Sequence, residues 1–182
     1  HMVVDIGGGT SDIAVISLSG VVESASIKIA GDKFDDAIVR YVRRKYNVLI
    51  GERSAEGIKK RIGTVYTRPQ TVSVDVKGRC VNQGLPKVIT VTSREMIEAL
   101  AEPVSAILDA ICEVIEQTPP ELLGDILRNG IVMTGGGSLL YGFDQLVTRA
   151  TGIKTRIAPD AVSCVAIGTG KSLDNLDMFE GR

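Results

Sequence analysis

The sequence predicts an α/β fold in which helices flank a mixed sheet and a smaller α+β unit is inserted. Three observations support this prediction. Strand-like and helical patterns alternate along 182 residues, 44% of which are hydrophobic. An early hairpin interrupts what would otherwise be a purely parallel pattern, which favours a mixed sheet. A short ribbon of alternating valines then separates two helical stretches, which indicates the insertion.

The first segments are predicted to be strands. An apolar run at residues 3–6 leads into three glycines, and a second run at 13–18 reaches a turn at 19–20 before an alternating segment continues to 29. From Asp32 the pattern becomes helical, with Phe34, Ile38 and Val42 on one face, and this helix should end near Asn47. These segments are expected to form a hairpin followed by a helix.

The inserted unit is predicted to contain one short helix and a two-stranded ribbon. Ser54 is positioned to cap a helix that carries Ile58 and Ile62. The ribbon combines the alternating valines at 72–76 with a second run at 88–92. Since such a ribbon is too small to be stable alone, it should cover the preceding helix.

The remaining elements return to the larger unit. Thr92 and Glu95 form a predicted capping box for one long helix, which should bend at Pro103 and end at Pro119. After it we expect a short helical stretch at 122–127, strands at 131–133 and 154–157 with a helix between them, and a last helix at about 162–176.

Composition excludes several classes of function. A formal net charge of −1 without long runs of one sign does not predict a nucleic-acid partner or a membrane surface held by bulk electrostatics. The single histidine, His1, excludes triads and metal sites built on histidine, and His1-Met2 resembles the remnant of an expression tag. Cys80, Cys112 and Cys164 are predicted to be buried free thiols in a reducing cytosol, and no apolar run reaches the roughly 20 residues of a membrane span.

The first motif with predicted chemistry runs from Asp5 to Asp12. Gly7, Gly8 and Gly9 can bring backbone N–H groups close to phosphate oxygens because no side chain intervenes, and Thr10 and Ser11 add hydroxyl donors. A carboxylate at the end of a strand, Asp5, could hold Mg²⁺ through water. The alternative is that the three glycines only build a sharp hairpin.

The second motif is Thr134-Gly135-Gly136-Gly137-Ser138, which follows a strand and opens a helix. Its bare backbone could lie flat against a planar base, and the N–H groups of the helix start could bind a phosphate. The alternative is a tight strand-to-helix turn with Ser138 as the cap. Neither motif is a Walker loop or a dinucleotide fingerprint.

Together these motifs resemble the second phosphate loop and the adenosine motif of the superfamily that contains actin, Hsp70 and sugar kinases. Within that superfamily the sequence resembles the MreB family of bacterial actin-like, rod shape-determining proteins nearly from end to end. The residues that carry this closer resemblance are Gly31-Asp32-Lys33-Phe34-Asp35, residues 41–46, Ile50-Gly51-Glu52, residues 119–122 and residues 164–171. The implied fold is domain II of an actin-like ATPase, which is ribonuclease H-like.

The resemblance implies a role for each matching residue. Asp5 would lie near Mg²⁺, the loop up to Ser11 and Asp12 against the phosphates of ATP or ADP, and Gly31-Asp32 near the sugar. Glu56 and Lys59 would meet the ribose and the adenine; their spacing is equally typical of an exposed ion pair on one helix face. Gly57 departs from the family, whose members more often carry a longer side chain there, and this leaves the position of the helix open.

The resemblance also implies an organisation. Residues 3–31 and 93–160 would form the larger subdomain, 32–92 the smaller one, and 161–182 a helix that crosses back to another domain. The superfamily's first phosphate loop appears nowhere in the sequence, so this chain would be a C-terminal half with no catalytic residue of its own and negligible ATPase activity.

The implied whole protein would be cytoplasmic. Its ATP-dependent filaments would organise cell-wall synthesis, with head-to-tail copies of itself and membrane-anchored elongation proteins as partners. The membrane would be reached only through segments outside this chain, and no nucleic acid is implied. Alternatives are half of a sugar-type metabolic kinase, half of an Hsp70-type nucleotide-binding domain, or a structural protein that binds no nucleotide.

Overall fold

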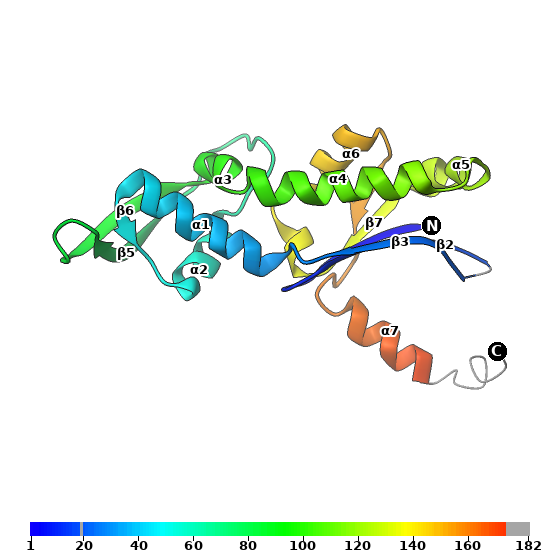
Figure 1. Cartoon of the computed structure of the whole chain (residues 1–182), viewed down its shortest axis with the longest axis horizontal. Coiled ribbons are helices and arrows are strands. Elements are labelled where there is room, and N and C mark those ends of the chain that lie inside the picture. Colours follow the sequence, from blue (N-terminus) through cyan, green and yellow to red (C-terminus); the bar gives the residue numbers. More distant parts are fainter. Residues whose placement is uncertain (19, 174–182) are drawn as a thin grey trace.

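The computed structural model describes residues 1–18 and 20–173, which form a five-stranded sheet and a smaller three-stranded sheet joined by helices (Figure 1). The five-stranded sheet lies at one end of the molecule and the three-stranded sheet at the other. Helix α4 (Ala101–Gln117) packs against strands of the larger sheet. The predicted α/β class is therefore confirmed.

The larger sheet is mixed, with the strand order β3-β2-β1-β7-β8. Strands β1 (Met2–Ile6), β2 (Ser11–Ser17) and β3 (Gly20–Ile27) form an antiparallel meander, as the early hairpin predicts. Strands β7 (Ile131–Thr134) and β8 (Thr155–Ile157) extend it in parallel from β1. Because β1 and β7 are parallel neighbours, the two glycine turns that follow them leave the sheet at the same edge.

The smaller sheet contains a strand that the sequence did not reveal. Strands β5 (Ser73–Cys80) and β6 (Pro86–Thr92) form the predicted ribbon, and β4 (Val48–Leu49) adds a third strand beside β5. Two residues are too few to produce an alternating pattern, so β4 could not be recognised. The sheet packs against α1 (Gly31–Tyr46) and α2 (Glu52–Ile62).

Two predicted helix boundaries were wrong. Ser54 does not cap α2, because the helix begins earlier: Gly51 is the N-cap, and its carbonyl accepts the N–H groups of Ser54 and Ala55. The predicted long helix is two helices, α3 (Ser93–Ala99) and α4, which meet at Leu100 and do not simply bend at Pro103. The ring of a proline within a helix clashes with the carbonyl four residues before it, which here is that of Ala99. The helix is therefore interrupted before Pro103 and not at it.

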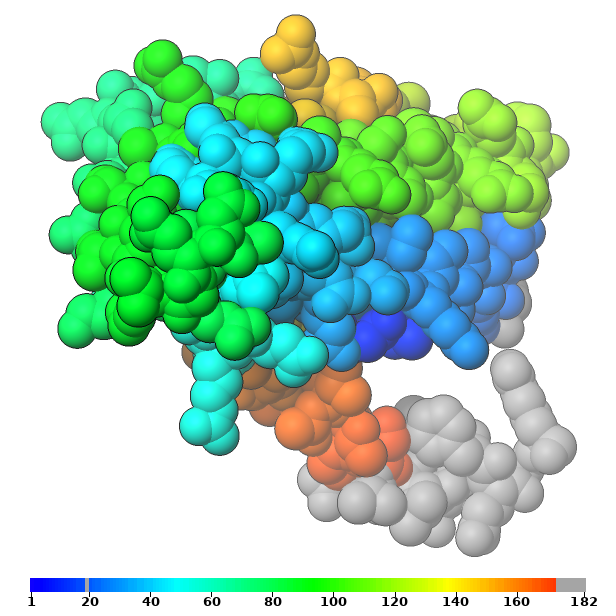
Figure 2. Space-filling view, turned by 60° about the vertical axis from the view of Figure 1, so that its left-hand side comes forward, coloured from blue at the N-terminus to red at the C-terminus, as the bar shows by residue number. Residues whose placement is uncertain are grey.

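The chain then continues through α5 (Pro120–Asn129), the 3₁₀ turn η1 (Gly136–Leu139), α6 (Phe143–Thr151) and α7 (Cys164–Leu173). Figure 2 shows α7 standing away from the body of the molecule, and Val165 on this helix is 61% exposed. Leu176, expected on the same face, lies outside the described residues. None of the helices in the described ranges has the length and apolar character that a bilayer crossing requires. All three cysteines are free but only half-buried.

Candidate functional site

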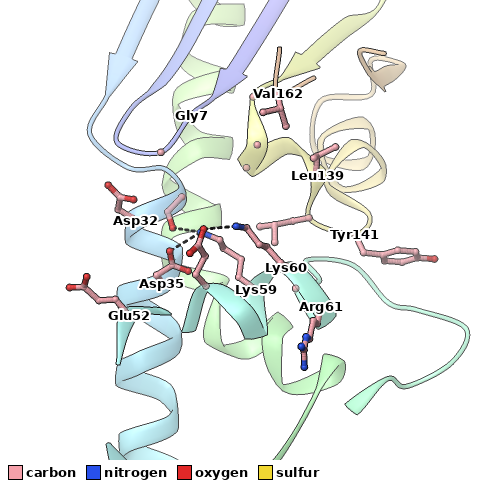
Figure 3. A pocket seen from close by; sticks show the side chains of 18 of the residues that line it. Gly7, Asp32, Asp35, Glu52, Lys59, Lys60, Arg61, Leu139, Tyr141 and Val162 are labelled. Carbon is pink, nitrogen blue, oxygen red and sulfur yellow. Dashed lines mark hydrogen bonds and ion pairs between the residues drawn. The ribbon is translucent and has the colours of Figure 1, made fainter. Parts of the chain in front are cut away.

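A pocket of about 890 Å³ opens where the larger sheet meets helices α1 and α2 (Figure 3). Most of its lining comes from four segments: the loop after β1, the start of α1, helix α2 and the turn after β7. The predicted site residues among its lining are Asp5, Gly7, Gly8, Gly31, Asp32, Glu56, Lys59, Gly135, Gly136 and Gly137. Segments separated by more than 100 residues in the sequence therefore converge on one cavity.

The glycine loop after β1 is fixed by hydrogen bonds to the start of α1. The Gly7 N–H donates to the carbonyl of Thr10 (2.9 Å), which closes the loop. The Gly31 N–H donates to the Gly7 carbonyl (3.0 Å) and the Asp32 N–H to the Gly8 carbonyl (2.8 Å). The first N–H groups of α1 are thus satisfied by the loop, which places loop and helix start in one rigid unit beside the pocket.

The second glycine turn lies directly against the end of β1. Gly135 has φ = +83°, a conformation that residues with a side chain rarely adopt, and a Cβ there would lie 2.3 Å from the Ile6 carbonyl oxygen. A Cβ on Gly137 would lie 2.3 Å from the Ile6 side chain. These two glycines are required by packing, whereas a Cβ on Gly136 would meet nothing within 4 Å. Gly136 therefore keeps its backbone open to the pocket.

Asp5 is the penultimate residue of β1, between the two turns, and one of its carboxylate oxygens is unsatisfied. Its Oδ1 is buried without a hydrogen-bond partner in the described structure. Burial, with a smaller contribution from the carboxylate of Asp12, raises the pKa of Asp5. An orphaned carboxylate oxygen at the edge of a polar pocket fits a cation or its bound water.

Lys59 and Asp35 form the best-shielded ion pair at the pocket. The Lys59 Nζ donates to Asp35 Oδ2 at 2.8 Å and to the Gly31 carbonyl at 2.9 Å (Figure 3). Burial raises the pKa of Asp35, and the hydrogen bond from Lys59 opposes that shift. Lys59 thereby connects α2 to the first turn of α1 and, through Gly31, to the glycine loop. Asp35 was not among the predicted site residues.

Glu56 pairs with a different lysine from the one its spacing suggested. Its Oε1 lies 2.6 Å from the Nζ of Lys60, four residues later on α2, and both side chains are largely exposed. That hydrogen bond lowers the pKa of Glu56. Glu56 and Lys59 both line the pocket, but the alternative of an ion pair between them does not describe this structure, because Lys59 is bound to Asp35.

Five predicted site residues do not line the pocket: Gly9, Thr10, Ser11, Asp12 and Ser138. The Ser11 hydroxyl donates to the Ile29 carbonyl (2.6 Å), and that of Ser138 to the Gly135 carbonyl (2.7 Å). Thr10 donates to Asp12 (3.0 Å), which also accepts a hydrogen bond from Ser26. In this structure the hydroxyls and Asp12 brace the two turns.

Other lining residues were not predicted. They are Asp35, Glu52, Arg53, Lys60, Arg61, Gly63, Arg68, Leu139, Leu140, Tyr141, Val162 and Val165. Residues 139–141 directly follow the second glycine motif, so their position in the sequence was a usable signal. Arg68 offered none, because it reaches the pocket from a loop, where its guanidinium carbon lies 4.2 Å from the centre of the Tyr141 ring.

Comparison with known proteins gives consistent matches. A model of the family described as MreB/Mbl protein matches residues 1–181. The cell shape-determining protein Mbl of Bacillus subtilis (strain 168) is 50% identical over 182 residues, which cover 100% of this chain and 55% of that protein. The cell shape-determining protein MreB of Escherichia coli (strain K12) is 50% identical over 180 residues, covering 99% and 52% respectively. The chain thus spans about half the length of these relatives.

A solved structure shows the same fold. The crystal structure of MreB5 of Spiroplasma citri bound to ADP superimposes with a TM-score of 0.95 at 41% sequence identity. The match covers 100% of this chain and 56% of that one.

Proposed function

Because this chain belongs to the MreB/Mbl family and has its actin-like fold, we propose that it supplies one wall of an ATP/ADP site in a cell shape-determining protein. Membership of this family sets aside the sugar-kinase and chaperone alternatives. The observation that carries the proposal is the convergence of both glycine turns on the pocket that Lys59 also lines. The ADP-bound state of the Spiroplasma citri relative supports it.

The proposed roles follow from the chemistry of each part of the pocket. Gly8 would present its backbone N–H to the phosphates, while Gly7, whose N–H donates to Thr10, shapes the loop; Gly136 would present backbone to the adenosine. Glu56 and Asp32 would accept hydrogen bonds from the ribose hydroxyls. Lys59 donates hydrogen bonds and cannot accept them, so it suits the ring nitrogens of adenine. To bind adenine it would give up part of its hydrogen bonding to Asp35 and Gly31.

We assign Mg²⁺ to the unsatisfied carboxylate oxygen of Asp5. A bound Mg²⁺ would neutralise charge on the phosphates. Asp5 would hold the ion through water, because Mg²⁺ gives up its waters reluctantly. The carboxylate of Asp12, which accepts hydrogen bonds from Thr10 and Ser26, would add negative charge near the proposed Mg²⁺ position.

In the whole protein, this wall would face a second one that carries the first phosphate loop, and α7 would dock its exposed residues there. Phosphoryl transfer requires charge stabilisation on both sides of the phosphate. We therefore expect this chain alone to show negligible ATPase activity, whereas robust turnover by the purified chain would contradict the proposal of a second wall.

The proposed function of the whole protein is a cytoplasmic, membrane-associated filament of head-to-tail copies whose assembly is linked to ATP hydrolysis. Such filaments would organise cell-wall synthesis and maintain rod shape together with membrane-anchored elongation proteins. The support is family membership, since the relatives are named for determining cell shape.

Calorimetry with Mg-ATP on the whole protein tests the site. Asp5→Ala and Gly136→Val should each weaken binding at least about tenfold, since one removes the metal-facing carboxylate and the other fills the backbone opening. Gly124→Val is the matched control, because Gly124 lies on α5 outside the pocket and also has free space around its Cβ position. Unchanged affinity in both site variants would refute the assignment.

A further inference from the structure

A second cavity lies next to the proposed nucleotide pocket and has a different lining. Its volume is about 310 Å³, and we call it the arginine pocket. Its lining consists of Thr64, Thr67, Arg68, Thr71, Ser93, Arg94 and Ile97. Two guanidiniums and four hydroxyls surround it, whereas no carboxylate does. Its local charge is therefore positive in a chain whose formal net charge is −1.

The cationic groups of the arginine pocket are available to a ligand. Among the residues that the structure describes, no carboxylate forms an ion pair with Arg68 or Arg94. Arg68 is half-buried and held over the Tyr141 ring, which restricts its motion, while Arg94 is exposed at the start of α3. A guanidinium has five donors and no acceptor, so its natural complement is an oxyanion.

Two buried hydroxyls indicate that the pocket is built to donate hydrogen bonds. Thr64 is 1% exposed, and its Oγ1 has no hydrogen-bond partner in the described structure. Ser93 is 2% exposed; its Oγ accepts the Val72 N–H (3.0 Å), and we find no acceptor for its own proton among the described residues. Buried polar groups in folded proteins are normally satisfied, so an unpaired hydroxyl in a cavity wall points to a missing acceptor.

We propose that the arginine pocket is a binding site for a phosphate-class oxyanion, distinct from the nucleotide site. A tetrahedral phosphate offers acceptor oxygens to both guanidinium forks and to the hydroxyls, and such charge-assisted bonds are the strong ones. The cavity exceeds the size of a single phosphate, so the anion can be free or be part of a larger headgroup. The proposal does not depend on the nucleotide assignment, although Arg68 lines both cavities.

Thermal unfolding of this chain with increasing inorganic phosphate, at constant ionic strength and without nucleotide, tests the proposal. Phosphate should raise Tm in a saturable way, because a ligand that binds only the folded state stabilises it. Arg94→Ala should weaken the apparent affinity about tenfold, the effect of one lost charge-assisted bond. Arg43→Ala is the matched control, since this exposed arginine on α1 lines neither pocket.

Thr64→Val provides a second variant that is expected to fold, because the hydroxyl it removes has no partner in the protein. It should weaken the apparent affinity for phosphate by up to about tenfold, the effect of one lost hydrogen bond, while keeping its Tm in phosphate-free buffer. If phosphate stabilises Arg94→Ala and Arg43→Ala equally, only an adventitious ion effect exists and the proposal is overturned. It is equally overturned if Gly136→Val abolishes the effect and Arg94→Ala does not, since the anion would then occupy the nucleotide pocket.

The source of the anion is distinguished with vesicles. Co-sedimentation with phosphatidylcholine vesicles containing phosphatidylglycerol, compared with phosphatidylcholine alone, tests a lipid headgroup. Binding that Arg94→Ala weakens and Arg43→Ala does not would identify a headgroup phosphate as the ligand. If the vesicles are not bound while free phosphate still stabilises the chain in an Arg94-dependent way, the ligand is a soluble phosphate.

Discussion

The ammonium of Lys59 on α2 lies 2.8 Å from a carboxylate oxygen of Asp35 on α1, and the two side chains are only 15% and 14% exposed. The same ammonium donates to the Gly31 carbonyl. One side chain therefore holds helices α1 and α2 together at the edge of the proposed nucleotide site. The binding and the stability of this region should consequently depend on the same residue.

Lys59→Met should lower the free energy of unfolding by about 2 kcal/mol at pH 7.5, between the effects typical of exposed and fully buried pairs. The pKa of Asp35 is already raised by burial, and loss of Lys59 removes the hydrogen bond that opposes the shift. Asp35 in the variant should then take up a proton more readily as pH falls. The deficit should be smaller at pH 5 than at pH 7.5.

Urea denaturation at both pH values measures this deficit. Lys60→Met is the control, because Lys60 forms an exposed pair with Glu56, and this substitution should change stability far less than Lys59→Met. Equal losses in the two variants would show that the shielded pair has no special role.

The glycines of the second turn should differ in their response to substitution. Gly135→Ala introduces a Cβ 2.3 Å from a backbone oxygen at φ = +83°, so it should lower the free energy of unfolding by about 2 kcal/mol or more. Gly136→Ala meets nothing within 4 Å and should remain within about 0.5 kcal/mol of the parent. Thermal or urea unfolding of the two variants measures the difference, and similar losses would contradict the described packing.

The convergence of the two glycine turns could be anticipated from the sequence once the strands were recognised. Each turn follows a short apolar strand, and parallel strands in one sheet end at the same edge. The bond between Lys59 and Asp35 could not be anticipated, because its partners are 24 residues apart on different helices. Helical spacing reveals only pairs on the same helix, such as Glu56 and Lys60.

The sequence could not show which acceptors the hydroxyl residues use. Ser11, Thr10 and Ser138 are chemically suited to bind phosphate, but each donates to a protein acceptor within or beside its own turn. Residue type cannot distinguish a hydroxyl that braces a turn from one that faces a ligand. Strand β4 was missed for another reason, since its two residues are too few to show an alternating pattern.

Asp5→Asn should weaken Mg²⁺-dependent nucleotide binding and make the folded chain more stable at neutral pH. The raised pKa of Asp5 means that the folded chain holds this proton more tightly than the unfolded one, so ionisation of Asp5 reduces stability as pH rises from near 3.8 through the folded-state pKa. The amide removes that effect. We expect the variant to be more stable at pH 7.5, by about 1 kcal/mol or less, and to differ less at pH 4.

The measurement is urea denaturation of this chain at the two pH values, with Asp109→Asn as an exposed control. In the whole protein the same Asp5 variant should lose the Mg²⁺ dependence of nucleotide binding. A variant that is destabilised at pH 7.5 would show that Asp5 makes a structural contribution that its unsatisfied oxygen does not suggest.

Glu95→Gln should be the clearest pH-dependent variant. Glu95 forms the capping box of α3 with Thr92 and accepts hydrogen bonds from Lys45 (2.8 Å) and Tyr46 on α1. Burial alone would raise the pKa of Glu95, but the hydrogen bonds from Lys45, Tyr46 and Thr92 outweigh it and lower the pKa from 4.5 to about 2. The ionised form therefore stabilises the fold above pH 4.5, and this contribution is lost as pH falls toward 2.

We expect Glu95→Gln to lower the free energy of unfolding by about 2 kcal/mol at pH 7, and the gap to the parent to narrow steadily below pH 4.5. Urea midpoints at several pH values between 2.5 and 7, about one pH unit apart, measure that gap. Glu113→Gln, an exposed change on α4, should show no such trend. Because Glu95 fixes the start of α3, where Ser93 and Arg94 line the arginine pocket, the variant should also weaken stabilisation by phosphate at pH 7. A gap that stays constant with pH would mean that the hydrogen bonds, and not the charge they surround, hold α3 in place.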